Sequence, residues 1–298
     1  MDIDAGRRAV TVGVDGSECA LRAVRWGAAE AARRGAPLRL VTAFGWLPER
    51  PVDRPSFRLE YREMLRGRAE AHLAIAKTAA EGAARQIEVD GEVVVGSPYA
   101  VLGAEARNAQ LLVVGSRGRG RLEGLLAGSV GVALAAGGLC PVVVVRGEER
   151  DPGEEAQLPV VVGVDGAATG EAAIAFAFDA AASRGVELVA VHAWRDVTVP
   201  FGRDPFEDWP VISEEELRAL DEWLARHLAG WTQKHPDVPV RRVLTQGRPA
   251  PCLLEQAQEA QLVVVGTHGR GELAGLVLGS VGNVLVHHAP CPVAVVRP

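Results

Sequence analysis

Two glycine-rich stretches contain the residues of this sequence best suited to chemistry. "GSRGRG" begins at Gly115 and "GTHGRG" at Gly266, each directly after an apolar run. In both, a second glycine follows after two residues and a Gly-Ser pair nine residues later, which gives the spacing G-x2-G-x9-G-S. Glycines let backbone N–H groups turn toward an anion with no Cβ in the way. The spacing therefore predicts phosphate binding at two places in the chain.

The Gly-Ser pair at the end of each stretch also predicts phosphate binding. "GSV" at Gly128 and at Gly279 opens a helical segment, and the free N–H groups and dipole of a helix start favour a phosphate. The serine hydroxyl can cap the helix, donate to a phosphate oxygen, or do both. A turn followed by an exposed basic loop is the alternative. The repetition of the whole pattern, together with Asp15 and Asp165, disfavours it.

The repetition extends along the chain. A shift of about 150 residues aligns "VTVGVDG" at Val10 with "VVVGVDG" at Val160, and "LCPVVVVR" at Leu139 with "APCPVAVVR" at Ala289. Solenoid repeats have periods of a few tens of residues, so this is a duplicated domain. We expect domains at residues 1–147 and 160–298, joined by an acidic, proline-bearing linker at 148–159.

Each half alternates short apolar runs with longer helical periods. Strands that are apolar at nearly every position, separated by helices, predict a parallel sheet covered on both faces. Five such strands per half predict two doubly wound α/β domains. In the first half the expected strands are Ala9–Val14, Leu38–Phe44, Glu92–Val95, Leu111–Val114 and Val142–Val145, and the expected helices are Glu18–Arg34, Leu59–Arg85, Ala100–Asn108 and Ser129–Gly137.

Ligands of such a sheet bind beyond the carboxyl ends of the strands, where the winding reverses. Three pieces of each half are expected to converge there: the "GVDG" after the first strand, the glycine-rich stretch, and the helix start at "GSV". In the second half, Ser213 followed by Glu216 also predicts a capping box at the start of a helix.

Composition restricts the partners and the compartment. The 298 residues carry a formal net charge of −6, which argues against a nucleic-acid or anionic-membrane surface. No N-terminal run has the pattern of a signal peptide, and no apolar run reaches membrane-spanning length. The four cysteines are scattered without a CxxC, so we expect reduced thiols in a cytoplasmic protein.

These residues together resemble a tandem universal stress protein of the ATP-binding class. The signature of that family is the same glycine spacing with an aspartate after the first strand, and the resemblance covers most of the chain. It implies that Asp15 and Asp165 hold the ribose and that Ala43 and Ala193 offer backbone to adenine. It also implies one ATP per domain, with Mg²⁺ held by the phosphates and not by a protein-built metal site.

The resemblance extends to individual positions of both halves. In the first half the implied nucleotide contacts are Gly13, Val14, Asp15, Ala43, Gly115, Arg117, Gly118, Arg119, Gly120, Gly128, Ser129 and Val130. In the second half they are Gly163, Val164, Asp165, Ala193, Gly266, His268, Gly269, Arg270, Gly271, Gly279, Ser280 and Val281.

The family also pairs its fifth strands across a two-fold interface. "PVVVV" at Pro141 and "PVAVV" at Pro292 are therefore expected to pair within this chain and make a pseudo-dimer of its two halves. Association of whole chains into a homodimer, and binding of protein partners, are further expectations.

No catalytic residue is assigned. The Walker lysine pattern and the G-x-S-x-G elbow are absent from the sequence, and a cradle of backbone amides supplies no base to activate water. We expect a nucleotide-dependent regulatory protein of the stress response with at most slow ATP hydrolysis. The alternatives are an ATP hydrolase and an interaction module with vestigial sites.

Two further segments carry their own expectations. The insert from Arg195 to Ser213 contains Phe201, Phe206 and Trp209, and is either a loop packed on its own domain or a lid that senses nucleotide. His287 and His288 are expected to complement a helix end.

Overall fold

The computed structural model describes residues 8–45, 55–116, 129–137, 139–147, 151–167, 170–194, 212–267 and 278–297. In the first half the strands are β1 (Val10–Gly13), β2 (Leu38–Phe44), β3 (Val89–Val95), β4 (Leu111–Gly115) and β5 (Val142–Val145). The helices of this half are α1 (Glu18–Arg34), α2 (Pro55–Ala83), α3 (Pro98–Glu105) and α4 (Ser129–Gly137).

The second half repeats this order. Its strands are β6 (Val160–Gly163), β7 (Leu188–Trp194), β8 (Val240–Gln246), β9 (Leu262–Gly266) and β10 (Val293–Val296). Its helices are α6 (Glu171–Arg184), α7 (Glu214–Lys234), α8 (Pro249–Gln256) with a 3-10 turn at Ala257–Glu259, and α9 (Ser280–His288). A short helix, α5 (Pro152–Glu155), lies in the segment between the halves.

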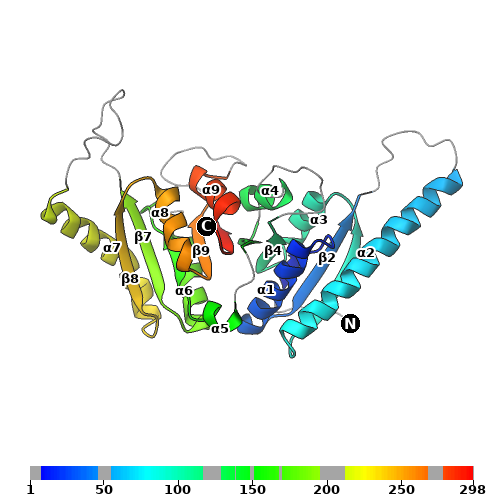
Figure 1. Cartoon of the computed structure of the whole chain (residues 1–298), viewed down its shortest axis with the longest axis horizontal. Coiled ribbons are helices and arrows are strands. Elements are labelled where there is room, and N and C mark those ends of the chain that lie inside the picture. The colour runs from blue at the N-terminus through cyan, green and yellow to red at the C-terminus, as the bar shows by residue number, and fades with distance from the viewer. Residues whose placement is uncertain are drawn as a thin grey trace, which may run out of the picture.

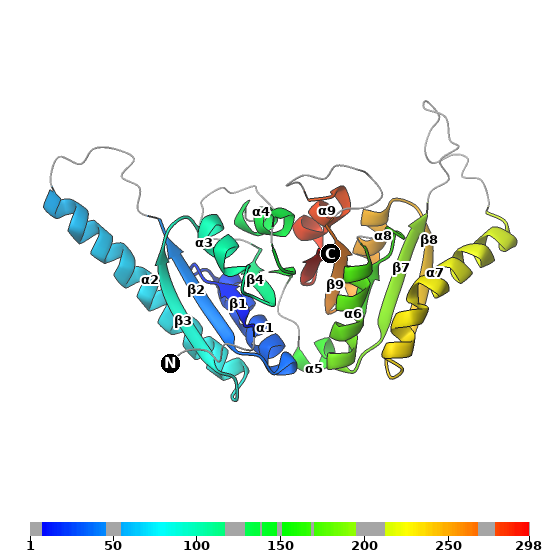
Figure 2. The same cartoon turned by 180° about the vertical axis from the view of Figure 1, so that it is seen from behind.

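The described strands form one ten-stranded sheet in the order β3-β2-β1-β4-β5-β10-β9-β6-β7-β8. Within each half every pairing is parallel, and the winding reverses between β1 and β4 and between β6 and β9. β5 and β10 pair antiparallel, with Val143 opposite Ala294, so the two halves meet as the expected pseudo-dimer. Both predicted doubly wound α/β domains are confirmed (Figures 1 and 2).

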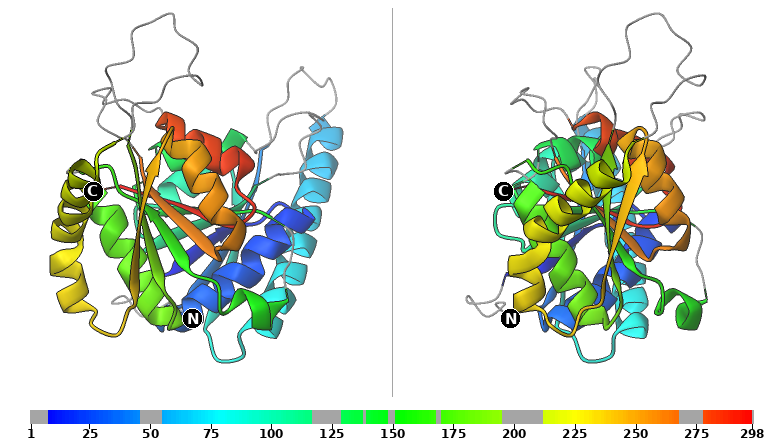
Figure 3. Two further views of the ribbon diagram at one scale, coloured as in Figure 1. Left: turned by 60° about the vertical axis from the view of Figure 1, so that its left-hand side comes forward. Right: turned by 90° about the vertical axis from the view of Figure 1, so that its left-hand side faces the viewer.

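Helices cover both faces of this strongly twisted sheet (Figure 3). α1, α2, α6 and α7 bury side chains such as Leu73 and Phe178 against one face. α3, α4, α8 and α9 bury Leu134, Leu285 and others against the opposite face. Because neighbouring residues of a strand point to opposite faces, nearly all-apolar strands such as β4 are what a sheet covered on both sides requires.

The boundaries that the sequence places wrongly have local causes. β3 begins at Val89, three residues before its predicted start, because Asp90 and Gly91 interrupt the apolar pattern. Arg39 on the neighbouring strand compensates for this polarity by donating hydrogen bonds to the carboxylates of Asp90 and Glu92. α3 begins at Pro98, two residues early, because the Ser97 side chain caps it and proline suits a first helical turn.

Another expectation from the sequence is confirmed. Ser213 and Glu216 form the predicted capping box at the start of α7. The four cysteines are all free, and Cys140, Cys252 and Cys291 are buried. Burial raises the pKa of the Cys140 thiol to about 11. Among the described residues, no helix has the length and apolar character needed to cross a membrane.

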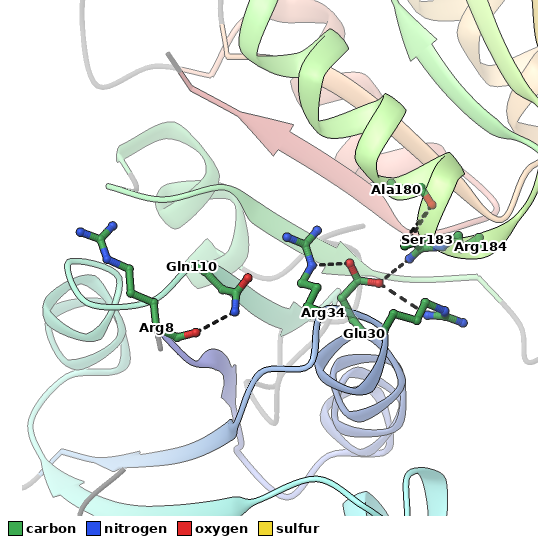
Figure 4. A network of polar contacts seen from close by, with 8 residues as sticks. Arg8, Glu30, Arg34, Gln110, Ala180, Ser183 and Arg184 are labelled. Carbon is green, nitrogen blue, oxygen red and sulfur yellow. Dashed lines mark hydrogen bonds and ion pairs between the residues drawn. The ribbon is translucent and has the colours of Figure 1, made fainter. Parts of the chain in front are cut away.

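A buried charge network joins the two halves on the α1/α6 side of the sheet (Figure 4). Glu30 of α1 is 1% exposed, and its carboxylate accepts hydrogen bonds from Arg34 Nε and from Arg184 Nη2 of α6, each at 2.6 Å. Burial alone raises the pKa of the Glu30 carboxyl, but Arg184 and Arg34 outweigh it, so the pKa lies below its usual value. The guanidinium groups also lie over rings of the opposite half, Arg34 over Phe176 and Arg184 over Trp26.

Removing the shared carboxylate leaves Arg184 buried without its anionic partner. We expect Glu30→Ala to lower the free energy of unfolding by about 3–5 kcal/mol, as for other broken buried ion pairs. The measurement is urea unfolding of the full chain. The control is Glu70→Ala, which removes a solvent-exposed ion pair with Arg66 on α2 and is expected to cost less than about 1 kcal/mol. Equal losses in the two variants would contradict the role given to the network.

The network also predicts how stability depends on pH. The pKa of Glu30 is lower in the folded chain than the ordinary value, so its stabilisation is complete above the unfolded-state pKa and disappears as the pH falls through the folded-state pKa. The difference in unfolding free energy between wild type and Glu30→Gln should therefore shrink from about pH 6 toward about pH 3. Urea titrations across this range measure it, and a constant difference would refute the assignment.

Candidate functional site

The strand register brings three predicted pieces of each half to one edge of the sheet. β1 lies between β2 and β4, with Gly13 opposite Val41 and Val12 opposite Val113. Asp15, Ala43 and Gly115 therefore lie at the carboxyl ends of three adjacent strands, beside the reversal of winding between β1 and β4. The second half places Asp165, Ala193 and Gly266 in the same way.

The aspartate after the first strand of each half lies in a tight turn. Asp15 Oδ1 accepts a hydrogen bond from the backbone N–H of Ser17, and Asp165 Oδ1 accepts one from Ala167, both at 2.9 Å. The intervening glycine has a φ of +76° in both halves, a conformation that favours glycine. The turn fixes each carboxylate at the strand edge.

Gly115, the first glycine of the phosphate pattern, is required by close packing. A Cβ at this position would lie 2.6 Å from the carbonyl oxygen of Cys19 in the first turn of α1. The backbone of β4 thus passes directly against the start of α1, and a side chain at this position would push the helix away.

The helix that follows each glycine-rich stretch starts above the end of the preceding strand. In the first half, a Cβ on Gly131 in α4 would contact Val114 at 3.4 Å and lie 3.9 Å from the Gly115 oxygen. In the second half, the backbone N–H of Gly279 donates to the carbonyl of Thr267 at 2.9 Å. α4 and α9 lie on the same side of the molecule, on either side of its midline (Figure 1).

The serine of each Gly-Ser pair is the first residue of its helix, not the cap. In the second half Gly279 is the cap residue, and no side chain caps α9. Of the two roles that the sequence leaves open for the serine hydroxyl, capping is therefore excluded for Ser280, because Ser280 is already the first helical residue. Donation to a phosphate oxygen stays a prediction. Ser129 and Ser280 are both exposed.

The remaining predicted contacts divide into two groups. Gly13, Val14, Val130, Gly163, Val164 and Val281 lie at the same strand edges and helix starts as the residues above. Arg117, Gly118, Arg119, Gly120, Gly128, His268, Gly269, Arg270, Gly271 and residues 195–211 of the insert lie outside the described residues. Among all the residues that the structure describes, no group of three or more His, Cys, Asp or Glu side chains is placed to hold a metal ion.

Sequence reasoning missed the aromatic side chains that support the aspartate turns. The ring of His72 on α2 occupies the space beside Gly16, where a Cβ would lie 2.5 Å from it. Trp223 on α7 takes the same place beside Gly166, where a Cβ would lie 2.4 Å from the ring. Trp223 is partly buried and packs against the core. No sequence signal marks such a contact, because the glycine and the ring are more than fifty residues apart.

The last turn of α9 contacts the first half of the chain. Arg146, which follows β5, donates a hydrogen bond to the carbonyl oxygen of Val286. His287 and His288 lie in this last turn, where the sequence predicts them. Burial, His288 and Arg146 lower the pKa of His287, in that order of size, which disfavours the positive charge that would complement the helix end.

The close approach at Gly115 makes a testable prediction. Gly115→Ala should lower the free energy of unfolding by about 1–3 kcal/mol because the new methyl group displaces the first turn of α1. The matched control is Gly103→Ala in α3, where nothing lies within 4 Å of the added Cβ. There the gain in helix propensity should stabilise the chain by about 0.5–1 kcal/mol. Chemical denaturation measures both, and a neutral Gly115→Ala would contradict the geometry.

Comparison with known proteins gives a consistent result. The sequence model described as "Universal stress protein family" matches residues 6–146 and again 158–297. Universal stress protein Rv2005c of Mycobacterium tuberculosis is 40% identical over 293 residues, which are 97% of this chain and 96% of the relative. Universal stress protein Rv1996 of the same organism is 39% identical over 305 residues, covering 97% and 94%.

A solved structure shares the fold over the whole chain. The crystal structure of a universal stress protein from Archaeoglobus fulgidus superposes with a TM-score of 0.70 at 19% identity, and the match covers 97% of this chain and 98% of that one. With the two family matches and the relatives from Mycobacterium tuberculosis, the conclusion is direct: this chain belongs to the universal stress protein family and carries two copies of the family's domain in tandem.

Proposed function

We propose that each half of the chain binds one molecule of ATP, and that the protein is a nucleotide-dependent regulator in the stress response. One observation carries the proposal. At both reversals of winding, an aspartate turn, a glycine at a strand end and a helix start come together, and this is where doubly wound sheets bind ligands.

The ribose is assigned to Asp15 and Asp165. In each half, Oδ1 of the carboxylate accepts a hydrogen bond from the backbone of its own turn, which fixes the carboxylate at the strand edge. A carboxylate held there is an acceptor group of the kind that sugar hydroxyls donate to. Backbone at Ala43 and Ala193, one strand away in the sheet, is assigned to adenine. Both alanines are half-buried.

The phosphates are assigned to the glycine-rich stretches and the starts of α4 and α9. The first N–H groups of a helix have no partner within it, and the exposed Ser129 and Ser280 add a hydroxyl at each helix start. Mg²⁺ would be held by the phosphates themselves. Its charge would offset theirs, and this chain's part is to present N–H and O–H donors.

Regulation is favoured over efficient hydrolysis. The acids at the two strand edges, Asp15 and Asp165, are assigned to sugar hydroxyls, and no described residue is assigned to activate water, which phosphoryl transfer needs. Slow hydrolysis, association into homodimers and occupancy-dependent protein partners remain part of the proposal. A true ATP hydrolase is the second candidate, and it would release stoichiometric ADP over time.

Calorimetric titration with Mg·ATP tests the proposal. Wild type should bind two nucleotides per chain, Asp15→Ala and Asp165→Ala one each, and the double variant none, because each substitution removes the ribose acceptor of one half. The control is Asp237→Ala, an exposed aspartate in the turn before the start of β8, at the opposite end of the strands from the candidate sites, which should leave the stoichiometry at two. A wild-type chain that takes up no nucleotide would refute the proposal. Chromatography of the titrated sample separates binding from hydrolysis.

A further inference from the structure

The two halves present the same aspartate turn but connect it to the following helix differently. In the first half Ser17 caps α1 by accepting a hydrogen bond from Ala20 N at 3.1 Å, and the helix begins at Glu18. In the second half Ala167 stands at the equivalent position and has no side-chain acceptor. α6 begins only at Glu171, and its cap residue, Gly170, makes no side-chain cap bond.

A cluster of three tilted rings lies beside the turn in the second half. Trp223 has its ring centroid 4.5 Å from that of His192 on β7 and 4.1 Å from that of His227 on α7. The Trp223 ring also covers Gly166, where a Cβ would lie 2.4 Å from Cζ2. Since Gly166 directly follows Asp165, the ring cluster packs against the turn that holds this carboxylate.

His192 also bonds the backbone of the turn. Its Nδ1 lies 2.7 Å from the carbonyl oxygen of Val164, and the ring is buried. A carbonyl oxygen only accepts, so Nδ1 is the donor. Val164 is thereby held by both of its backbone groups, because its N–H donates to Val191 at 2.9 Å.

In the described part of the first half, no side chain equivalent to His192 supplies this donor. Thr42 stands on β2 where His192 stands on β7, and its buried hydroxyl oxygen Oγ1 makes no hydrogen bond to the described residues. His72 covers Gly16 in place of Trp223. The turn of the first half is thus followed directly by a capped helix. The turn of the second half instead packs against a cluster of rings, of which His192 is hydrogen-bonded to it.

We propose that His192 and Trp223 are positioning residues for Asp165 and so for the nucleotide of the second half alone. This inference rests on the proposed nucleotide-binding function. His192 fixes the carbonyl before Asp165, and Trp223 fixes the glycine after it. The carboxylate is therefore ordered before the ribose arrives, which reduces the entropic cost of binding.

The test measures each site separately in the full chain. Asp15→Ala leaves the second-half site to be titrated with Mg·ATP, and Asp165→Ala leaves the first-half site. Adding His192→Thr, which introduces the residue used by the first half, should weaken ATP about tenfold in the Asp15→Ala chain and less than twofold in the Asp165→Ala chain. His192→Asn, which keeps a donor near the Nδ1 position, should recover part of the affinity.

Trp223→Ala should weaken the second-half site in the same selective way. Its matched control is Trp231→Ala, two turns further along α7, where the ring packs near Phe178 and His235 and not at the turn. Amide hydrogen exchange without nucleotide supplies a readout independent of binding. His192→Thr should speed exchange at residues 164–167 and leave residues 14–17 unchanged, whereas Ser17→Ala should do the reverse.

The outcomes separate this inference from the proposed function. No uptake of ATP by wild type or by either single-site chain would refute nucleotide binding itself. Two results would overturn the positioning role while nucleotide binding stands. In one, His192→Thr changes the affinity for ATP at the second-half site by less than twofold. In the other, it weakens the affinity equally at both sites. If His192→Thr fails to fold, the Trp223→Ala and Trp231→Ala pair decides: equal affinities in the second half refute the role.

Discussion

The antiparallel pairing of β5 with β10 is the contact on which the rest of this molecule depends. Both strands are buried and rich in valine. Without this pairing, each would be the edge strand of its domain and would expose unpaired backbone N–H and C=O groups among apolar side chains. By pairing with each other they remove one open edge from each domain and make a single sheet. The remaining edges, β3 and β8, carry polar and charged side chains such as Asp90 and Arg241, which discourage further strand addition.

The same pairing explains why charge is buried between the halves. It brings α1 and α6 together, and Glu30 then accepts from arginines of both. The pseudo-symmetry is broken here, since Ala180 occupies the position of Glu30 in the second half, and the carbonyl of Ala180 accepts from Arg184 (Figure 4). A pair of identical domains would place two acids or none at this contact. Duplication within one chain lets a single carboxylate serve the guanidinium groups of three arginines, Arg33, Arg34 and Arg184.

Divergence of the halves is also visible at the strand edges that form the candidate sites. The elements common to both are backbone features: the aspartate turn, the glycine with positive φ, and a helix that starts over the fourth strand. The elements that differ are the side chains behind them, Ser17 and Thr42 in one half and Trp223 and His192 in the other. The candidate binding surface is repeated, whereas the side chains packed behind it differ between the halves.

The sequence by itself determined the two-domain duplication, the doubly wound sheets and the convergence of Asp15 and Gly115, because apolar strands, glycine spacing and strand order follow local rules. It misplaced β3 and α3, where polar residues and a capping serine override the apolar pattern. Only the tertiary structure decided that Glu30 meets Arg184, that Gly115 lies against Cys19, and that a tryptophan covers Gly166. These contacts join residues that are far apart in the chain, and the spacing of apolar residues along the sequence does not predict them.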